Sequence, residues 1–133
     1  MSSISVLVVD DEIELANLFR TCLQKVGFET ISFTDPRTAL EYIKDNFNTF
    51  SLILTDLRMP HMSGLDLAVE IRKLDEKIKI VLITAFMTED LIDDFKFKNA
   101  KIDRVVQKPV KLAELRNSVA QDIEADIGCL ILY

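Results

Sequence analysis

The sequence predicts an α/β domain in which helices cover both faces of a five-stranded parallel sheet. Five short apolar runs alternate with five stretches whose apolar residues recur every three or four positions, the pattern of helices with one buried face. Carboxylate, hydroxyl or ammonium side chains follow directly after four of these runs. In open parallel sheets, ligands bind beyond the carboxyl ends of the strands. A doubly wound α/β fold with right-handed crossovers accounts for both observations.

The first part of the chain predicts two strand–helix units. Residues 4–9 form a continuous β-branched run, typical of a strand buried on both faces, and a helix over residues 13–26 follows and stops at the next glycine. Residues 28–33 are more polar and predict a strand nearer an edge. Asp35 and Pro36 are typical of a helix start. The predicted inner faces of the two helices are Leu15, Phe19, Cys22, Val26, Ala39, Leu40, Ile43 and Phe47.

The third unit begins with a short apolar strand, residues 52–54, that brings Asp56 to its carboxyl end. The chain then breaks at a Met-Pro pair and a glycine before a helix that reaches about Leu74. Residues 79–83 predict the fourth strand, because they are again apolar and β-branched. The predicted inner face of the third helix is Leu67, Ala68, Ile71 and Leu74.

The remaining residues predict two more helices around a fifth strand. Thr88 is expected to cap the fourth helix, and Asn99 to end it in a left-handed conformation. A short strand lies within residues 102–106. The inward residues expected in the two helices are Leu91, Ile92, Phe95, Leu112, Leu115, Val119 and Ile123.

Length and charge limit the classes of function. The 133 residues predict one domain over residues 1–125, followed by an apolar tail over 126–133 and no output domain. The net charge of −6 argues against direct nucleic-acid binding, which needs clustered Lys and Arg. No run has the ~20 apolar residues of a membrane span, and no signal peptide precedes the first strand. We therefore expect a cytoplasmic protein without membrane contact, with Cys22 and Cys129 as reduced thiols. The tail extends the last helix, packs on the domain or forms a homodimer contact.

Five polar residues are expected at one edge of the sheet. Asp10 and Asp11 follow the first strand, Asp56 the third, Thr84 the fourth and Lys108 the fifth. Two like charges about 4 Å apart repel by about 4 kcal/mol at an effective dielectric constant near 20. A divalent cation with oxygen ligands offsets that cost, and Mg²⁺ suits a site with two or so carboxylates. The cluster therefore predicts a metal-assisted phosphoryl-transfer site, in which Lys108 adds a second positive charge.

The motifs at these strand ends resemble those of the receiver domains of two-component response regulators. They are VLVVDDE at 6–12, LILTDLRMPHMSG at 52–64, LITA at 82–85 and KP at 108–109. The resemblance covers about residues 4–125. It implies the flavodoxin-like (CheY-like) strand order 2-1-3-4-5 with five helices.

The resemblance also implies a role for each matched residue. Asp56 would take a phosphoryl group from a sensor histidine kinase or a histidine phosphotransfer protein. Asp11, Asp56 and the main-chain carbonyl of Arg58 would ligate Mg²⁺, with Mn²⁺ as the alternative, and Asp10 would act largely through metal-bound water.

Three residues would bind the phosphoryl group itself. The Thr84 hydroxyl, the Ala85 amide and the Lys108 ammonium are expected to contact its oxygens. The domain would then switch the binding of a downstream protein, or of an output domain, through the surface made by the fourth helix, the fifth strand and the fifth helix. Such a domain is a signalling module that catalyses only its own phosphoryl transfer and dephosphorylation.

One position departs from the family pattern. Receiver domains usually carry an aromatic residue three positions before the lysine, where this chain has Val105. We expect Phe86 and Arg58, which flank the site in sequence, to slow the hydrolysis of the acyl phosphate.

Two other functions are alternatives to that of a phospho-acceptor. A pseudo-receiver would act only as an interaction module, but the complete set of five site residues argues against it. A metal-dependent phosphatase would need a second nucleophile or a general acid beside Asp56, and the sequence has no glycine-rich phosphate loop or Ser-His pairing.

Overall fold

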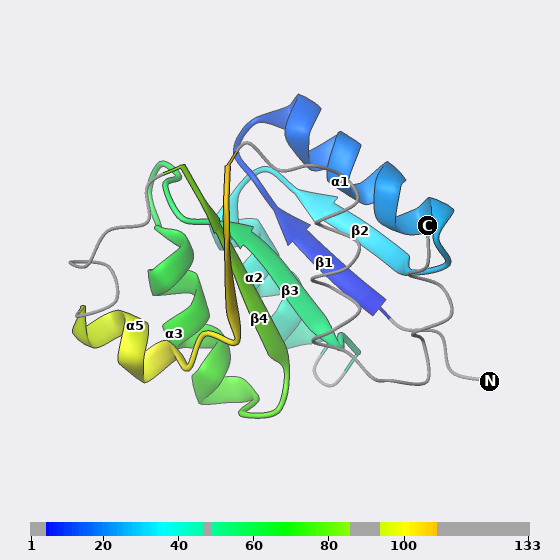
Figure 1. Cartoon of the computed structure of the whole chain (residues 1–133). Coiled ribbons are helices and arrows are strands. Elements are labelled where there is room, and N and C mark those ends of the chain that lie inside the picture. The colour runs from blue at the N-terminus through cyan, green and yellow to red at the C-terminus, as the bar shows by residue number, and fades with distance from the viewer. Residues whose placement is uncertain (1–4, 47–48, 86–93, 109–133) are drawn as a thin grey trace.

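The computed structural model describes residues 5–46, 49–85 and 94–108, and Figure 1 shows their arrangement. Five parallel strands form one sheet in the order β2-β1-β3-β4-β5. The strands are β1 (Ser5–Val9), β2 (Glu29–Phe33), β3 (Leu52–Asp56), β4 (Lys79–Thr84) and β5 (Arg104–Gln107). The helices in the described residues are α1 (Ile13–Lys25), α2 (Pro36–Asp45), α3 (Gly64–Leu74) and α5 (Phe95–Ala100). The predicted fold class and strand order are confirmed.

Alternate residues of the central strands face two separate apolar layers. Val6 and Val8 of β1 pack in a cluster with Phe19 and Leu23 of α1. Leu7, between them, packs on the opposite face in a cluster that includes α2 and α3. Side chains alternate between the two faces of a strand, so the continuous apolar runs are explained by helices on both sides.

The helix starts follow the local capping chemistry. The Asp35 side chain accepts a hydrogen bond from the Arg37 backbone N–H at 2.8 Å, and Pro36 occupies the first turn, as predicted. A capping box begins α3: the Ser63 hydroxyl accepts from the Asp66 N–H at 3.1 Å, and the Asp66 carboxylate accepts from the Ser63 N–H at 3.3 Å. This box directly follows the loop after Asp56, so it sets how that loop enters the helix.

The prediction for the fourth helix was wrong in two respects. Phe95 is 75% exposed instead of inward, because the helix begins at the Asp94 cap and Phe95 is its first residue. The left-handed residue is Lys101, with φ of 51°, and not Asn99, which lies inside α5. Phe97 provides the apolar contact instead, against a cluster of Leu65 and Leu82.

Several predicted features lie outside the described residues. They are Phe47, the Thr88 cap with Leu91 and Ile92, the helix expected around Leu112–Ile123, and the tail over 126–133. Among the helices that are described, none is long and apolar enough to cross a membrane.

Candidate phospho-acceptor site

The three aspartates meet at the carboxyl edge of the sheet. Asp56 is the last residue of β3, and Asp10 follows β1 directly. The register pairs Val9 with Thr55, so the next residues of the two strands are Asp10 and Asp56. One carboxylate oxygen of each of Asp10, Asp11 and Asp56 lies within 4.8 Å of the others. Asp10 and Asp56 are buried and Asp11 is exposed, so the cluster opens to solvent on one side.

Lys108, the residue after β5, brings a positive charge to this cluster. Its Nζ lies 3.3 Å from Asp56 Oδ2 and 3.7 Å from Asp10 Oδ2. Its backbone N–H donates to the Thr84 carbonyl at 2.8 Å, directly after the paired strands β4 and β5. The lysine position is therefore set by the sheet, as predicted from the strand ends.

Two backbone N–H groups hold the buried carboxylates. The Glu12 N–H donates to Asp10 Oδ1 and the Leu57 N–H to Asp56 Oδ1, both at 2.9 Å. Burial nevertheless raises the pKa of Asp10 from 3.8 to about 6, although the Glu12 hydrogen bond and the Lys108 charge oppose this shift. Burial also raises the pKa of Asp56, against the charge and hydrogen bond of Lys108. Each carboxylate is thus less stable as an anion than it would be in water.

The donor set fits a hard divalent cation. Asp10 Oδ2 is buried and, within residues 5–46, 49–85 and 94–108, accepts no hydrogen bond. Its ion pair with Lys108 is long, so a second cation would stabilise it further. Three carboxylate oxygens within 4.8 Å, one of them open to solvent, match the preference of Mg²⁺ for a few carboxylates together with water. The residues present therefore fit the predicted metal.

The other predicted site residues surround this cluster. Thr84 ends β4 and is 1% exposed, while Ala85 after it is exposed. Arg58 is exposed in the loop after Asp56. Val105 is half-buried and packs against the Leu65–Leu82 cluster, and Phe86 lies outside the described residues.

Gly64 was predicted only to break the chain, but it has a second role at the site. Its N–H donates to the Leu57 carbonyl at 2.8 Å, and a Cβ atom at this position would lie 2.2 Å from the Asp56 carbonyl oxygen. Only glycine lets the start of α3 approach the Asp56 backbone this closely. The glycine was visible in the sequence, but no sequence pattern indicated the close contact with Asp56 that requires it.

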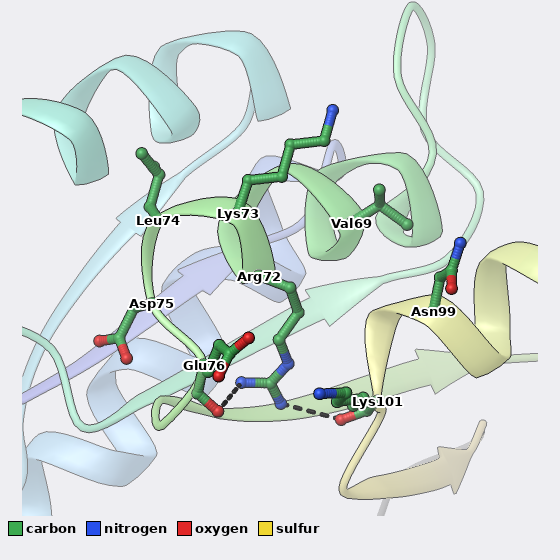
Figure 2. A pocket seen from close by; sticks show the side chains of 8 residues that line it. All are labelled: Val69, Arg72, Lys73, Leu74, Asp75, Glu76, Asn99 and Lys101. Atoms are coloured by element: carbon green, nitrogen blue, oxygen red, sulfur yellow. Dashed lines mark hydrogen bonds between the residues drawn. The ribbon is translucent and has the colours of Figure 1, made fainter.

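A hollow of about 520 Å³ between α3 and α5 is a separate feature, shown in Figure 2. At its base the Arg72 guanidinium donates to the carbonyls of Glu76 and Lys101 at 3.1 and 2.8 Å. It also donates to the carbonyl of Ala100 at 2.7 Å and to Asp103 Oδ2 at 3.0 Å. The Arg72 side chain is only 8% exposed. This arginine therefore joins three segments of the fold, and its donors are already engaged.

Comparisons with known proteins agree with this geometry. The family model of the response regulator receiver domain matches residues 6–120. The chain is 31% identical over 115 residues to the response regulator receiver protein CpdR of Brucella abortus, which covers 86% of this chain and 92% of CpdR. It is 26% identical to sporulation initiation phosphotransferase F of Bacillus subtilis, over 90% of this chain and 93% of that protein. The resemblance inferred from the motifs is confirmed.

Longer relatives match over only part of their length. The chain spans 20% of the Arabidopsis thaliana two-component response regulator ARR10, at 30% identity. Among solved structures, response regulator TrrA of Thermotoga maritima in complex with Mg²⁺ and BeF has a TM-score of 0.78 and 31% identity, covering 90% of this chain and 99% of TrrA. A Vibrio cholerae chemotaxis protein, CheY4, has a TM-score of 0.83 at 23% identity and covers 91% of this chain and 99% of its own, which supports the fold alone.

Proposed function

Because the chain belongs to the receiver-domain family of two-component response regulators, we propose that Asp56 accepts a phosphoryl group and that this modification switches the binding of a partner. The observation that carries the proposal is the position of the Asp56 carboxylate: it ends a buried strand, 3.3 Å from Lys108 and beside two further aspartates. Positioning and charge neutralisation are the main requirements of phosphoryl transfer.

The contacts of Asp56 support different roles for its two oxygens. Oδ1 is held by the Leu57 N–H, and Oδ2 faces the Lys108 ammonium. Oδ2 attacks the phosphorus of a phosphohistidine; the new P–O bond forms as the P–N bond breaks, and the imidazole nitrogen leaves with the electron pair. Lys108 keeps Asp56 ionised against the effect of burial and contacts the transferred group. Thr84 and the Ala85 N–H bind its remaining oxygens.

Asp10, Asp11, Asp56 and the Arg58 carbonyl would hold Mg²⁺, or Mn²⁺ in its place. When bound, the ion neutralises negative charge on the phosphoryl oxygens. Asp10 and Asp56 are already oriented by the Glu12 and Leu57 N–H groups, so the site needs little rearrangement to bind the metal.

The phosphoryl donor in this proposal is a sensor histidine kinase or a histidine phosphotransfer protein. The receiver is a signalling module that catalyses only its own phosphorylation and dephosphorylation, in the cytoplasm. Its partner is a downstream protein or an output domain. On the described part of the expected output surface, Phe95 is 75% exposed and Lys98 and Lys101 are exposed, which favours a partner with apolar and acidic groups.

Beryllofluoride binding tests this function without a kinase. Fluorine NMR of the protein with Mg²⁺, beryllium and fluoride should show a bound species in the unmodified protein and none in Asp56→Asn. Omitting Mg²⁺ should also abolish it. If the folded protein binds neither Mg²⁺ nor beryllofluoride, it acts as a phosphorylation-independent pseudo-receiver.

A further inference from the structure

Helix α5 is attached to the rest of the domain very differently at its two ends. At its C-terminal end Ala100 is fully buried, and the carbonyls of Ala100 and Lys101 accept hydrogen bonds from the buried Arg72 guanidinium. Figure 2 shows the hydrogen bond from Arg72 of α3 to the Lys101 carbonyl. Asp103 adds to it, because its Oδ2 accepts from both Arg72 and the Ile80 N–H, at 3.0 and 2.7 Å. Buried contacts of this kind are hard to break, since each leaves a polar group unpaired.

At its N-terminal end the described polar contact with α3 is an exposed ion pair, beside Phe97, which packs against the Leu65–Leu82 cluster. Lys96 Nζ lies 2.7 Å from Asp66 Oδ1 in the first turn of α3, and the two side chains are 59% and 37% exposed. The hydrogen bond between them lowers the pKa of Asp66 and raises that of Lys96, as expected for a formed pair. Exposed ion pairs contribute little to stability, so this pair can be broken at low cost.

Hydrogen bonds and the short backbone segments between them connect the Asp56 carboxylate with this pair. The Leu57 N–H donates to Asp56 Oδ1, and the Leu57 carbonyl accepts from the Gly64 N–H, at 2.9 and 2.8 Å. Gly64 is the first residue of α3, whose capping box ends in the Asp66 carboxylate. That carboxylate binds Lys96. The loop after Asp56, the start of α3 and the start of α5 are therefore joined by polar contacts as well as by the packing of Phe97.

We propose that the Asp66–Lys96 pair is a latch that holds the N-terminal end of α5 against α3 while Asp56 is unmodified, and that a phosphoryl group on Asp56, or beryllofluoride in its place, releases it. This inference rests on the proposed function. When Asp56 Oδ2 carries a phosphoryl group, Oδ1 becomes the uncharged carbonyl oxygen of an acyl phosphate and is a weaker acceptor for the Leu57 N–H, and the change passes through Gly64 to the capping box. Helix α5 then turns about its C-terminal end, where Arg72 holds it. This coupling from Asp56 to α5 needs no aromatic side chain at the position of Val105, where receiver domains usually carry one.

The latch makes a quantitative prediction about affinity. An interaction present only in the empty state opposes ligand binding, so its removal tightens binding by the factor that the interaction contributed. For an exposed pair we expect Asp66→Asn and Lys96→Met each to tighten Mg²⁺–beryllofluoride binding by about two- to fivefold. The double variant should gain no more than either single one, because both changes break the same contact.

A second ion pair of similar exposure provides the control. Lys73 Nζ lies 2.9 Å from Glu70 Oε2, three residues apart within α3, so this pair joins no two elements. Glu70→Gln and Lys73→Met should leave the affinity unchanged. In Asp66→Asn the amide oxygen of the side chain can still accept from the Ser63 N–H, and Lys96→Met leaves the capping box intact, so both variants should fold.

Titration calorimetry of beryllofluoride into the Mg²⁺-loaded full chain separates the outcomes. Tighter binding in both single variants, without further gain in the double one, supports the latch. Unchanged or weaker binding in the single variants, or gains that multiply in the double one, overturns it while the proposed function stands. If the unmodified protein and all variants fail to bind, the proposed function itself is wrong and the latch with it.

Discussion

Lys108 Nζ lies 3.3 Å from Asp56 Oδ2, so the residue after β5 supplies the cation for the carboxylate that ends β3. The same nitrogen is 3.7 Å from Asp10 Oδ2. One ammonium group thus stabilises two buried carboxylates, both of whose pKa values are raised by burial.

Replacing Lys108 with methionine should destabilise the metal-free protein. At pH 8 the free energy of unfolding should fall by about 1–3 kcal/mol, because the buried carboxylates lose their counter-ion. The loss should be smaller at pH 5, where Asp10 takes up a proton. Urea unfolding in EDTA measures both values, with the exposed Lys98→Met as control. Equal stability of the Lys108 variant and the unmodified protein at pH 8 would contradict the assigned contact.

Replacing Asp10 with asparagine should have the opposite effect on stability. Since the pKa of Asp10 is about 6 in the folded protein and 3.8 as its ordinary value, the folded state binds this proton more tightly than the unfolded state. The favourable contribution is therefore complete below about pH 4 and is lost as the pH rises through about 6. Asp10→Asn should raise the unfolding free energy of the metal-free protein at pH 8 by up to about 3 kcal/mol, and by little at pH 4.

The exposed Asp11→Asn is the control for this change, because it removes a carboxylate from the same cluster without removing a buried charge. Both variants should lose the stabilisation that Mg²⁺ gives to the unmodified protein. A stabilisation by Asp10→Asn that is equal at pH 4 and pH 8 would show that the buried charge is not its cause.

Replacing Gly64 with alanine should disturb both folding and the site. The added Cβ would lie 2.2 Å from the Asp56 carbonyl oxygen, so α3 or the end of β3 must move. We expect a loss of about 1–3 kcal/mol in urea unfolding, together with weaker Mg²⁺ binding. Glu70→Ala, exposed on the same helix, should change stability by less than about 0.5 kcal/mol. Normal stability and Mg²⁺ affinity in Gly64→Ala would argue against the close contact.

The strand ends made the site predictable. Asp10, Asp56, Thr84 and Lys108 each follow an apolar run, and parallel strands bring such positions to one edge whatever the details of packing. The helices on both faces of the sheet were equally predictable, because strands that are apolar throughout must be covered on both sides.

Contacts between distant elements were not predictable in this way. Phe95 and Phe97 both suit a buried helical position, and only the start at Asp94 decides that Phe97 packs inward. Arg72 binds carbonyl groups 28 and 29 residues away, and no residue pattern identifies a main-chain acceptor. The Asp66–Lys96 pair likewise depends on how α3 and α5 lie against each other.

The lifetime of the acyl phosphate should depend on the residues expected to shield it. Phe86→Ala should shorten the phosphoryl half-life relative to the unmodified protein, because water reaches the acyl phosphate more easily, and Arg58→Ala should act in the same direction. Phe86→Leu, which keeps an apolar side chain, is the control. A half-life that is unchanged or longer in Phe86→Ala would count against this shielding.

The most direct test of the proposed function is the position of the phosphoryl group. The protein is incubated with Mg²⁺ and acetyl phosphate, its intact mass is measured, and the modified residue is mapped after borohydride reduction of the acyl phosphate. We predict a single adduct with the mass of one phosphoryl group on Asp56, absent in Asp56→Asn and in EDTA. No adduct on the folded protein, or an adduct that persists in Asp56→Asn, would contradict the assignment of Asp56 as the phospho-acceptor.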